Sequence, residues 1–260
     1  MRSGGVSEAT GGRIAGFVLI AAGLAALEWA VASRHVRRAL VPAPSDVFAE
    51  LVHIIRAGDL WAPLGQTLLL LAIAYIVASA AAIAVGLAMG RSRALFNLLE
   101  PLVEIVRPLP KPALLPPLIL FMGIGSAMKI TIVALAVFFP VLINTVQGVR
   151  GIDAVMIGTA RTFGYGRFQI VRKIVLPAAL PFIFTGLRVS LGLGLILVVV
   201  AEMLAGTGGV GYLILDMQRT FQARAMYAWL VILACLGFAL NAGFVFLERR
   251  ILFWSVVSDR

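Results

Sequence analysis

The chain has 260 residues, of which 61% are hydrophobic and only 13% are charged, and its mean hydropathy is +1.03. A soluble domain carries charge on roughly a quarter of its residues, so this composition excludes an ordinary soluble protein. The net charge of +10 does not indicate a nucleic-acid partner, because the basic residues are scattered through short connecting segments and do not gather on an aromatic-rich face.

The apolar residues come in runs of about 20, the length at which a helix spans a bilayer. A transmembrane β-barrel would instead alternate polar and apolar residues over about ten positions. The sequence therefore predicts an all-α, polytopic membrane protein with about six transmembrane helices. His35 and His53 have no partner at metal-ligand spacing, so we expect no metal and no cofactor.

The first apolar run, residues 14–32, follows Arg2 and Arg13. Its charged start and small residues resemble a secretory signal, but it is longer than a typical signal core and contains Glu28. We predict a retained transmembrane helix, with a cleaved signal as the alternative. An outer amphipathic helix, capped by Ser45 or Asp46, is expected to complete an N-terminal segment of residues 1–60.

The remaining spans are predicted at residues 63–89, 97–125, 130–146, 182–203 and 225–247. The span at 97–125, the third in the chain, meets five prolines between positions 108 and 117, so it must be broken or kinked. Broken backbone at membrane depth is tolerated where it is buried in protein or lines a cavity. A plain proline kink at the interface is the alternative.

Charged residues inside or beside these spans are candidates for a transport path, because charges are costly in hydrocarbon. The candidates are Arg107, Pro108, Pro110, Lys111, Arg188 and Glu202. Arg107 and Lys111 could attract an anion, although pairing with Glu104 explains Arg107 equally well. Arg188 could also extend to the cytoplasmic interface.

A polar stretch, residues 158–177, separates the fourth and fifth spans and carries four basic residues and no acidic one. Residues 153–163 have the spacing of a short helix, and Gly164–Tyr165–Gly166 supplies a stop and a turn. Residues 167–176 predict a second short helix, closed by Pro177. We call residues 153–177 the elbow. Its clustered aromatic residues favour a contact surface over a loop that only satisfies topology.

The elbow resembles the cytoplasmic loop of permease subunits of bacterial ABC importers, which has the pattern E-A-A-x-x-x-G-x9-I-x-L-P. The matching positions are Ala160, Gly164, Ile174, Leu176 and Pro177. Gly158 and Thr159 depart from the pattern, because they stand where Glu and Ala are usual. Residues 41–44, 107–110, 118–125 and 176–181 resemble the nitrate/sulfonate/taurine importer permeases, and the resemblance covers roughly residues 40–254.

This resemblance implies a type I ABC importer permease fold over residues 61–250, with a coupling loop at 150–180 and a cytoplasmic tail at 251–260. The partners it implies are two cytoplasmic ATPase subunits, an extracytoplasmic solute-binding protein and a second copy of the chain. The residues it assigns to ATPase coupling are Gly158, Thr159, Ala160, Arg161, Phe163, Gly164, Tyr165, Phe168, Ile174, Leu176 and Pro177.

We therefore expect a permease that moves a small, anionic, sulfonate-, nitrate- or taurine-like solute across the bacterial inner membrane by alternating access. Basic residues are more numerous in the segments predicted inside, which places both termini in the cytoplasm.

No P-loop, H-E-x-x-H or G-x-S-x-G pattern occurs, so the chain is not expected to be an enzyme. The alternatives are import of an aromatic acid or vitamin precursor, and a stand-alone secondary transporter.

The stretch Gly206–Thr207–Gly208–Gly209–Val210–Gly211 matches the dinucleotide-binding pattern G-x-G-x-x-G. That pattern needs a preceding strand within a βαβ unit, and here it follows a predicted transmembrane helix. We therefore interpret it as a flexible outer loop.

Overall fold

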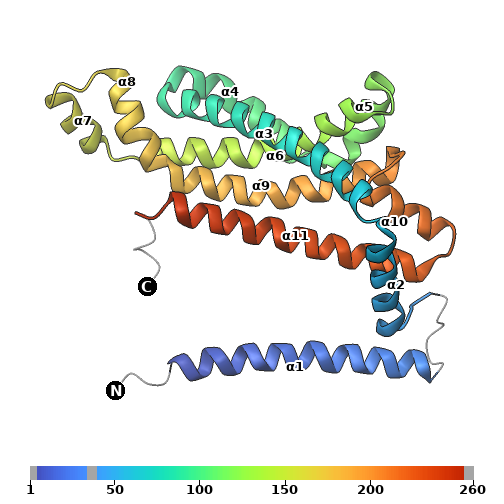
Figure 1. Cartoon of the computed structure of the whole chain (residues 1–260). Coiled ribbons are helices and arrows are strands. Elements are labelled where there is room, and N and C mark those ends of the chain that lie inside the picture. Colours follow the sequence, from blue (N-terminus) through green and yellow to red (C-terminus); the bar gives the residue numbers. More distant parts are fainter. Residues whose placement is uncertain (1–4, 34–39, 255–260) are drawn as a thin grey trace. The chain divides into compact units, whose positions relative to one another are not determined.

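The computed structural model of the chain describes residues 5–33 and 40–254, and within these ranges every regular element is a helix. These residues form two compact units (Figure 1). The first unit combines the described residues before Ala62 with Leu213–Ile232. The second combines Ala62–Tyr212 with the described residues after Ile232.

In the first unit, α1 (Gly5–Ala32) is joined to α2 (Pro44–Ala57) by two hydrogen bonds. The backbone N–H and the hydroxyl of Ser45 donate to the Glu28 carboxylate at 3.1 and 2.7 Å. The prediction that Ser45 or Asp46 caps α2 is wrong, because the N-cap is Ala43 and Pro44 occupies the first turn. Proline suits that position, since it lacks the N–H that a first turn leaves unpaired.

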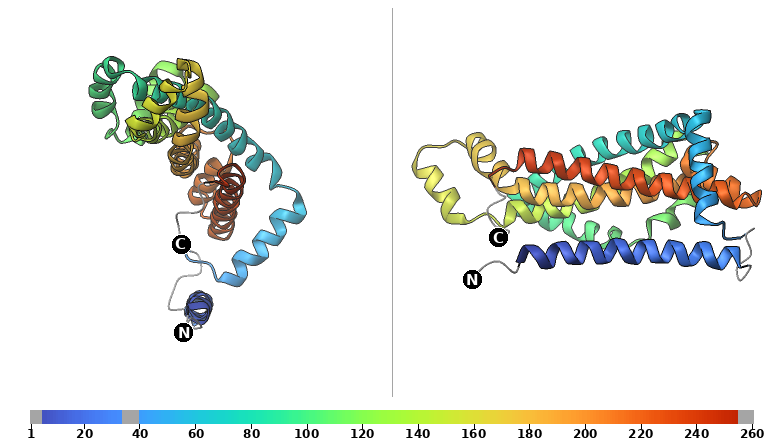
Figure 2. Two further views of the ribbon diagram at one scale, coloured as in Figure 1. Left: turned by 90° about the vertical axis from the view of Figure 1, so that its left-hand side faces the viewer. Right: turned by 60° about the horizontal axis from the view of Figure 1, so that its bottom comes forward.

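The second unit is built on long helices. These are α3 (Trp61–Arg91), α6 (Ser126–Arg150), α9 (Leu176–Ala205) and the later part of α11 (Ala223–Ile251). Figure 2 shows α6 and α9 side by side, and their contact is the most extensive in the chain. Glycine permits it, since a Cβ on Gly186 of α9 would overlap Asn144 and the Pro140 carbonyl of α6.

The predicted break in the third span is present. It separates α4 (Arg93–Val106) from the short helices η1 (Lys111–Leu114) and α5 (Leu115–Met122), and the two halves are bent by 89°. Pro108 and Pro110 lie in the bend, where their missing N–H groups interrupt the helix. At the other end of α4, the Ser92 hydroxyl accepts from Leu95 N and caps the helix.

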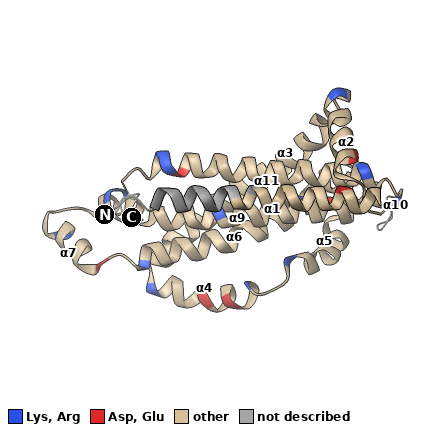
Figure 3. Cartoon of the chain, turned by 90° about the horizontal axis from the view of Figure 1, so that it is seen from below, with Lys and Arg blue, Asp and Glu red and all other residues tan. Residues whose placement is uncertain are grey.

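Four helices among the described residues are long and apolar enough to cross a membrane, and the number rises to five if the bent pair is counted as one span. Along these helices the charged residues lie mainly near the ends and in α4 (Figure 3). The apolar part of α1, Val18–Ala32, is shorter than the other spans, so a retained first span stays a prediction. Arg2 and residues 255–260 of the predicted tail lie outside the described residues.

Candidate functional site

The first half of the elbow is α7 (Ala154–Thr162), and both of its ends are set by local hydrogen bonds. The Asp153 carboxylate accepts from Val155 N at 2.8 Å and caps the start. At the other end, Gly164 has φ +78°, and its N–H donates to Arg161 O at 2.9 Å. Tyr165 N donates to Ala160 O at 3.0 Å, which completes a Schellman motif.

The second half of the elbow is not a separate helix, contrary to the prediction. Helix α8 (Arg167–Ile170) continues through the π-helical turn η2 (Val171–Val175) into α9, so Pro177 and Pro181 lie inside one continuous rod. Leu176 N donates to Val171 O, five residues back. This shift of register directly before Pro177 lets the helix continue across a residue that has no N–H.

A small apolar core fixes the elbow to the bundle. Its buried side chains are Val149, Ala160, Ile170, Val175, Ala179 and Ile183, and Ile174 and Leu176 pack against them. The Arg91 guanidinium, at the end of α3, also donates to Arg167 O at 3.5 Å. In Figure 1, α7 and α8 lie at one end of the second unit and α5 lies at the other. The elbow is therefore an anchored projection.

The outer surface of the elbow carries exposed aromatic and aliphatic side chains, although the elbow lies in a largely polar stretch of the sequence. Phe163 is 76% exposed and Phe168 is 74% exposed, and the Lys173 ammonium lies 5.1 Å from the centre of the Tyr165 ring. Val155 and Phe163 are exposed one turn to either side of Thr159. Sequence reasoning missed Val155, although the four-residue spacing from Val155 to Thr159 and from Thr159 to Phe163 was a usable signal.

The residues assigned to the coupling loop divide into two groups. Those exposed are Gly158, Thr159, Arg161, Phe163, Gly164, Tyr165 and Phe168. Ala160 is buried, and Ile174, Leu176 and Pro177 are partly buried, so these four position the others. A Cβ at Gly158 would meet no atom within 4 Å, so that position has open space around it.

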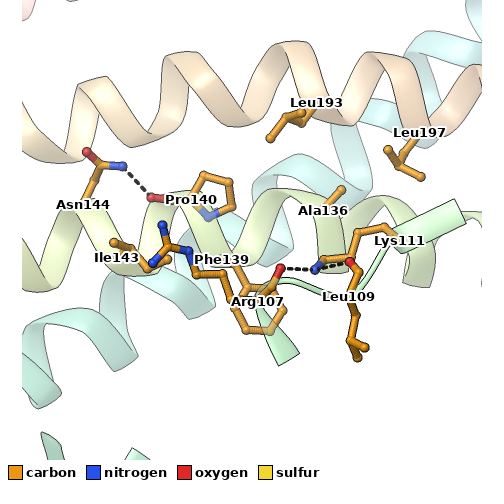
Figure 4. Close-up of a pocket in the computed structure, with 10 residues that line it drawn as sticks. All are labelled: Arg107, Leu109, Lys111, Ala136, Phe139, Pro140, Ile143, Asn144, Leu193 and Leu197. Atoms are coloured by element: carbon orange, nitrogen blue, oxygen red, sulfur yellow. Dashed lines mark hydrogen bonds between the residues drawn. The ribbon is translucent and has the colours of Figure 1, made fainter. Parts of the chain in front are cut away.

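A second feature is an open pocket of about 400 Å³ in the second unit, at the bend between α4 and η1 (Figure 4). The residues lining it are Arg107, Leu109, Lys111, Ala136, Phe139, Pro140, Ile143, Asn144, Leu193 and Leu197. They come from the bend, from α6 and from α9. The pocket is mostly apolar, with polar groups from Arg107, Lys111 and Asn144.

The hydrogen-bond donors of the Lys111 ammonium are used by groups of the protein itself. It donates to Arg107 O at 2.8 Å, Leu109 O at 2.9 Å and Val106 O at 3.1 Å. Its fourth contact is the Phe139 ring, 5.0 Å from Nζ to the ring centre. Lys111 therefore caps the carbonyl end of the broken helix and presents little free charge to the pocket.

Arg107 is placed differently from Lys111. Its Nη1 lies 3.5 Å from Glu104 Oε1, and in Figure 4 its side chain extends toward Ile143 and Asn144. Arg107 also lines a neighbouring pocket of about 190 Å³, which contains Glu104, Glu100 and Gln147. The two pockets share Arg107 and Ile143, so they adjoin along α4 and α6, and we call the two together the lane.

The structure does not bring the other predicted pathway residues to this pocket. Arg188 makes an ion pair with Glu248 of α11 at 3.9 Å. Pro108 and Pro110 shape the bend but do not line the pocket. Glu202 lies near the far end of α9 and is fully buried.

Glu202 belongs to a buried polar network that the sequence did not reveal. The Thr67 hydroxyl lies 2.9 Å from each Glu202 carboxylate oxygen, and Gly211 N donates to Oε2 at 3.0 Å. Thr67 Oγ1 in turn accepts from Val210 N at 3.0 Å. Lys129 is also buried and is electrostatically coupled to the carboxylate. The network connects α3 and α9 to the glycine-rich loop.

Residues 206–211, predicted to be a loop, include the start of helix α10 (Val210–Arg219), and their glycines pack closely against α9. Gly209 has φ +95°, and a Cβ there would overlap the Glu202 carboxylate. A Cβ at Gly211 would overlap Val199 O. The glycines therefore allow a close approach of the loop backbone to α9, and Val210 between them is fully buried.

Comparison with known proteins agrees with this architecture. Residues 78–253 match the family described as "Binding-protein-dependent transport system inner membrane component". The chain is 34% identical to the taurine transport system permease TauC of Escherichia coli (strain K12) over 232 residues, 87% of this chain and 84% of TauC. It is 33% identical to SsuC of Bacillus subtilis (strain 168), a permease named for aliphatic sulfonates transport, over 83% of this chain and 78% of SsuC.

The fold is also similar to a solved structure of the MetNI methionine ABC transporter. The TM-score is 0.59 at 22% sequence identity, over 72% of this chain and 93% of that one. The likeness supports the predicted type I importer fold, and the sulfonate and taurine relatives confirm the predicted resemblance. The chain therefore belongs to the binding-protein-dependent inner membrane components, which are the multi-pass permease subunits of ABC importers.

Proposed function

We propose that this chain forms the transmembrane path of an ATP-driven importer for a small anionic solute, and that its elbow receives the movement of the ATPase. Permeases of this family work with a separate ATPase and a substrate-binding protein. For this chain the partners are two cytoplasmic ATPase subunits, an outer binding protein and a second copy of itself. Its setting is the inner membrane, with both termini in the cytoplasm.

The observation that carries the proposal is the construction of the elbow. Phe163 and Phe168 are about three-quarters exposed on a projection whose inner side is fixed by Ala160 and Ile170. Exposed aromatic side chains on a rigid support are typical of a protein contact. The second half of the elbow, α8, continues without a break into α9, so a displacement of α8 is transmitted directly to the helix that lines the pocket.

The substrate class is inferred from relatives and from charge. TauC and SsuC are named for taurine and aliphatic sulfonates, which carry a sulfonate group. The pocket beside the bend contains the Arg107 guanidinium, whose planar array of donors suits anions. We therefore place anion passage at this pocket, with alternating access provided by two packings of the helices that the partners bias.

The elbow is tested with the complete transporter, meaning this chain with its ATPase and binding protein, in proteoliposomes. Phe163→Asp should uncouple ATP hydrolysis from uptake, because a carboxylate replaces an apolar contact, while insertion into the membrane is unchanged. The matched control is Phe253→Asp, since Phe253 is 74% exposed outside the elbow. Normal uptake by a normally assembled Phe163→Asp complex would contradict the docking role.

The same preparation tests the dependence on ATP. Uptake should stop when the ATPase is left out. Persistent uptake by the chain alone, driven by an ion gradient, would instead support a secondary transporter.

A further inference from the structure

The pocket at the bend contains one charged group whose hydrogen-bond donors are not all used. Lys111 is committed to three backbone carbonyls and to the Phe139 ring. Arg107 makes one ion pair, to Glu104, and its guanidinium makes no other hydrogen bond or ion pair with the described residues. Any anion that enters the pocket therefore meets Arg107 as its principal charged partner.

The existing partner of Arg107 is held weakly. A single Nη1 to Oε1 contact of 3.5 Å joins the two side chains, which are 54% and 62% exposed. Exposed ion pairs of this kind have strengths that correspond to about a 1.5- to 5-fold change in an equilibrium constant. A ligand that takes up two guanidinium donors at once can compete with such a pair.

Glu104 is also in the right place to compete. It lines the second pocket of the lane with Glu100 and Gln147, on the side of Arg107 nearer the start of α4. In Figure 1 that end of α4 lies toward the elbow. An anion that leaves Arg107 in this direction passes the Glu104 carboxylate, which can return to Arg107 as the anion departs.

We propose that Glu104 is an internal competitor for Arg107: the substrate anion displaces the Glu104 carboxylate on binding, and the carboxylate's return expels the anion. Glu104 thereby sets the affinity of the path low enough for release and disfavours neutral solutes, which cannot displace it. This inference rests on the proposed anion path at Arg107.

The test measures binding of ethanesulfonate to the purified complete transporter in nanodiscs, without its binding protein, by NMR titration. Glu104→Gln removes the competing charge and should tighten ethanesulfonate binding about 1.5- to 5-fold. Glu104→Asp keeps the charge and should bind more like the unaltered chain. Asp59→Asn is the charge-matched control, because Asp59 lies in the first unit and lines neither pocket, and it should leave the affinity unchanged.

A neutral probe separates competition from a change of pocket shape. Dimethyl sulfone should bind equally well to the unaltered chain and to Glu104→Gln. If Glu104→Gln leaves ethanesulfonate binding unchanged or weakens it, the competitor role is overturned. If Glu104→Gln tightens the binding of both probes alike, the effect comes from shape and the role is also overturned.

A second variant distinguishes failure of the competitor proposal from failure of the proposed anion path. Arg107→Gln should abolish saturable ethanesulfonate binding while the complex still assembles, as judged by size-exclusion chromatography. If Arg107→Gln binds as well as the unaltered chain, the anion path at this pocket is wrong and the competitor proposal falls with it. If Arg107→Gln loses binding and Glu104→Gln shows no gain, only the competitor proposal falls.

Discussion

The Thr67 hydroxyl lies 2.9 Å from both carboxylate oxygens of Glu202, although the two residues are 135 positions apart in the chain. Both side chains are fully buried. A buried carboxylate is costly unless it accepts hydrogen bonds, and Thr67 together with Gly211 N supplies them. This pair therefore fixes the glycine-rich loop to α3 and α9.

Thr67→Val tests the network with almost no change in volume. It removes a donor to Glu202 and the acceptor of Val210 N, so we expect the free energy of unfolding to fall by about 1–3 kcal/mol. Thermal unfolding of the detergent-solubilised chain measures it. Thr131→Val is the control, because among the described residues its exposed hydroxyl bonds only to Ala127 O. An unchanged melting temperature for both variants would contradict the role of the network.

Gly209→Ala tests the close packing of the glycine-rich loop. A Cβ would overlap the Glu202 carboxylate at a φ of +95°, so we expect a loss of about 1–3 kcal/mol in the same unfolding measurement. Gly192→Ala provides the contrast, since a Cβ there meets no atom within 4 Å in α9. That substitution should gain about 0.5–1 kcal/mol. Equal effects of the two variants would mean that the loop is loosely packed.

Gly164→Ala tests the turn of the elbow. Alanine at a φ of +78° is unfavourable by about 1–2 kcal/mol, so the Schellman turn should open more often. Hydrogen–deuterium exchange of residues 160–166 should become faster, above all at Tyr165 N, which bonds to Ala160 O. Gly158→Ala, at an unobstructed helical position, should slow exchange in α7, and the reverse ranking would count against this account.

Lys111→Met tests whether the ammonium acts on the fold or on the ligand. Three carbonyls lose their donor, so we expect the bend to open and the free energy of unfolding to fall by about 1–3 kcal/mol. Saturable ethanesulfonate binding should persist, because Arg107 supplies the free donors. Abolition of binding with unchanged stability would show that Lys111 contacts the anion directly.

Features that depend on residues close together in the chain were predictable from the sequence. Asp153 and Gly164 mark the ends of α7 through hydrogen bonds that span two to five positions. The prolines at 108 and 110 likewise predicted the break in the third span. The continuation of the elbow through Pro177 was not predictable, because it depends on a π turn for which the sequence carries no clear signal.

The pathway residues illustrate the same division. Arg107 and Lys111 were predicted together because they are near neighbours in the chain, and they do line one pocket. Arg188 and Glu202 were grouped with them because charges in apolar runs are unusual. In the folded chain, Arg188 pairs with Glu248, and Glu202 belongs to the Thr67 network.

The sequence by itself determined that this protein is an all-helical membrane protein, because hydropathy, proline breaks and helix-end signals act over one or two turns of chain. The permease role followed from the resemblance of the elbow to a known family. Only the tertiary structure decided which charged side chain is available to a ligand and which already has its hydrogen-bond partners within the protein. Lys111 is occupied by carbonyls, Glu202 by Thr67 and Gly211, and Arg107 alone among them retains donors for a ligand. Hydrogen-bond partners are chosen by packing between helices, so the availability of a charged side chain is a property of the fold.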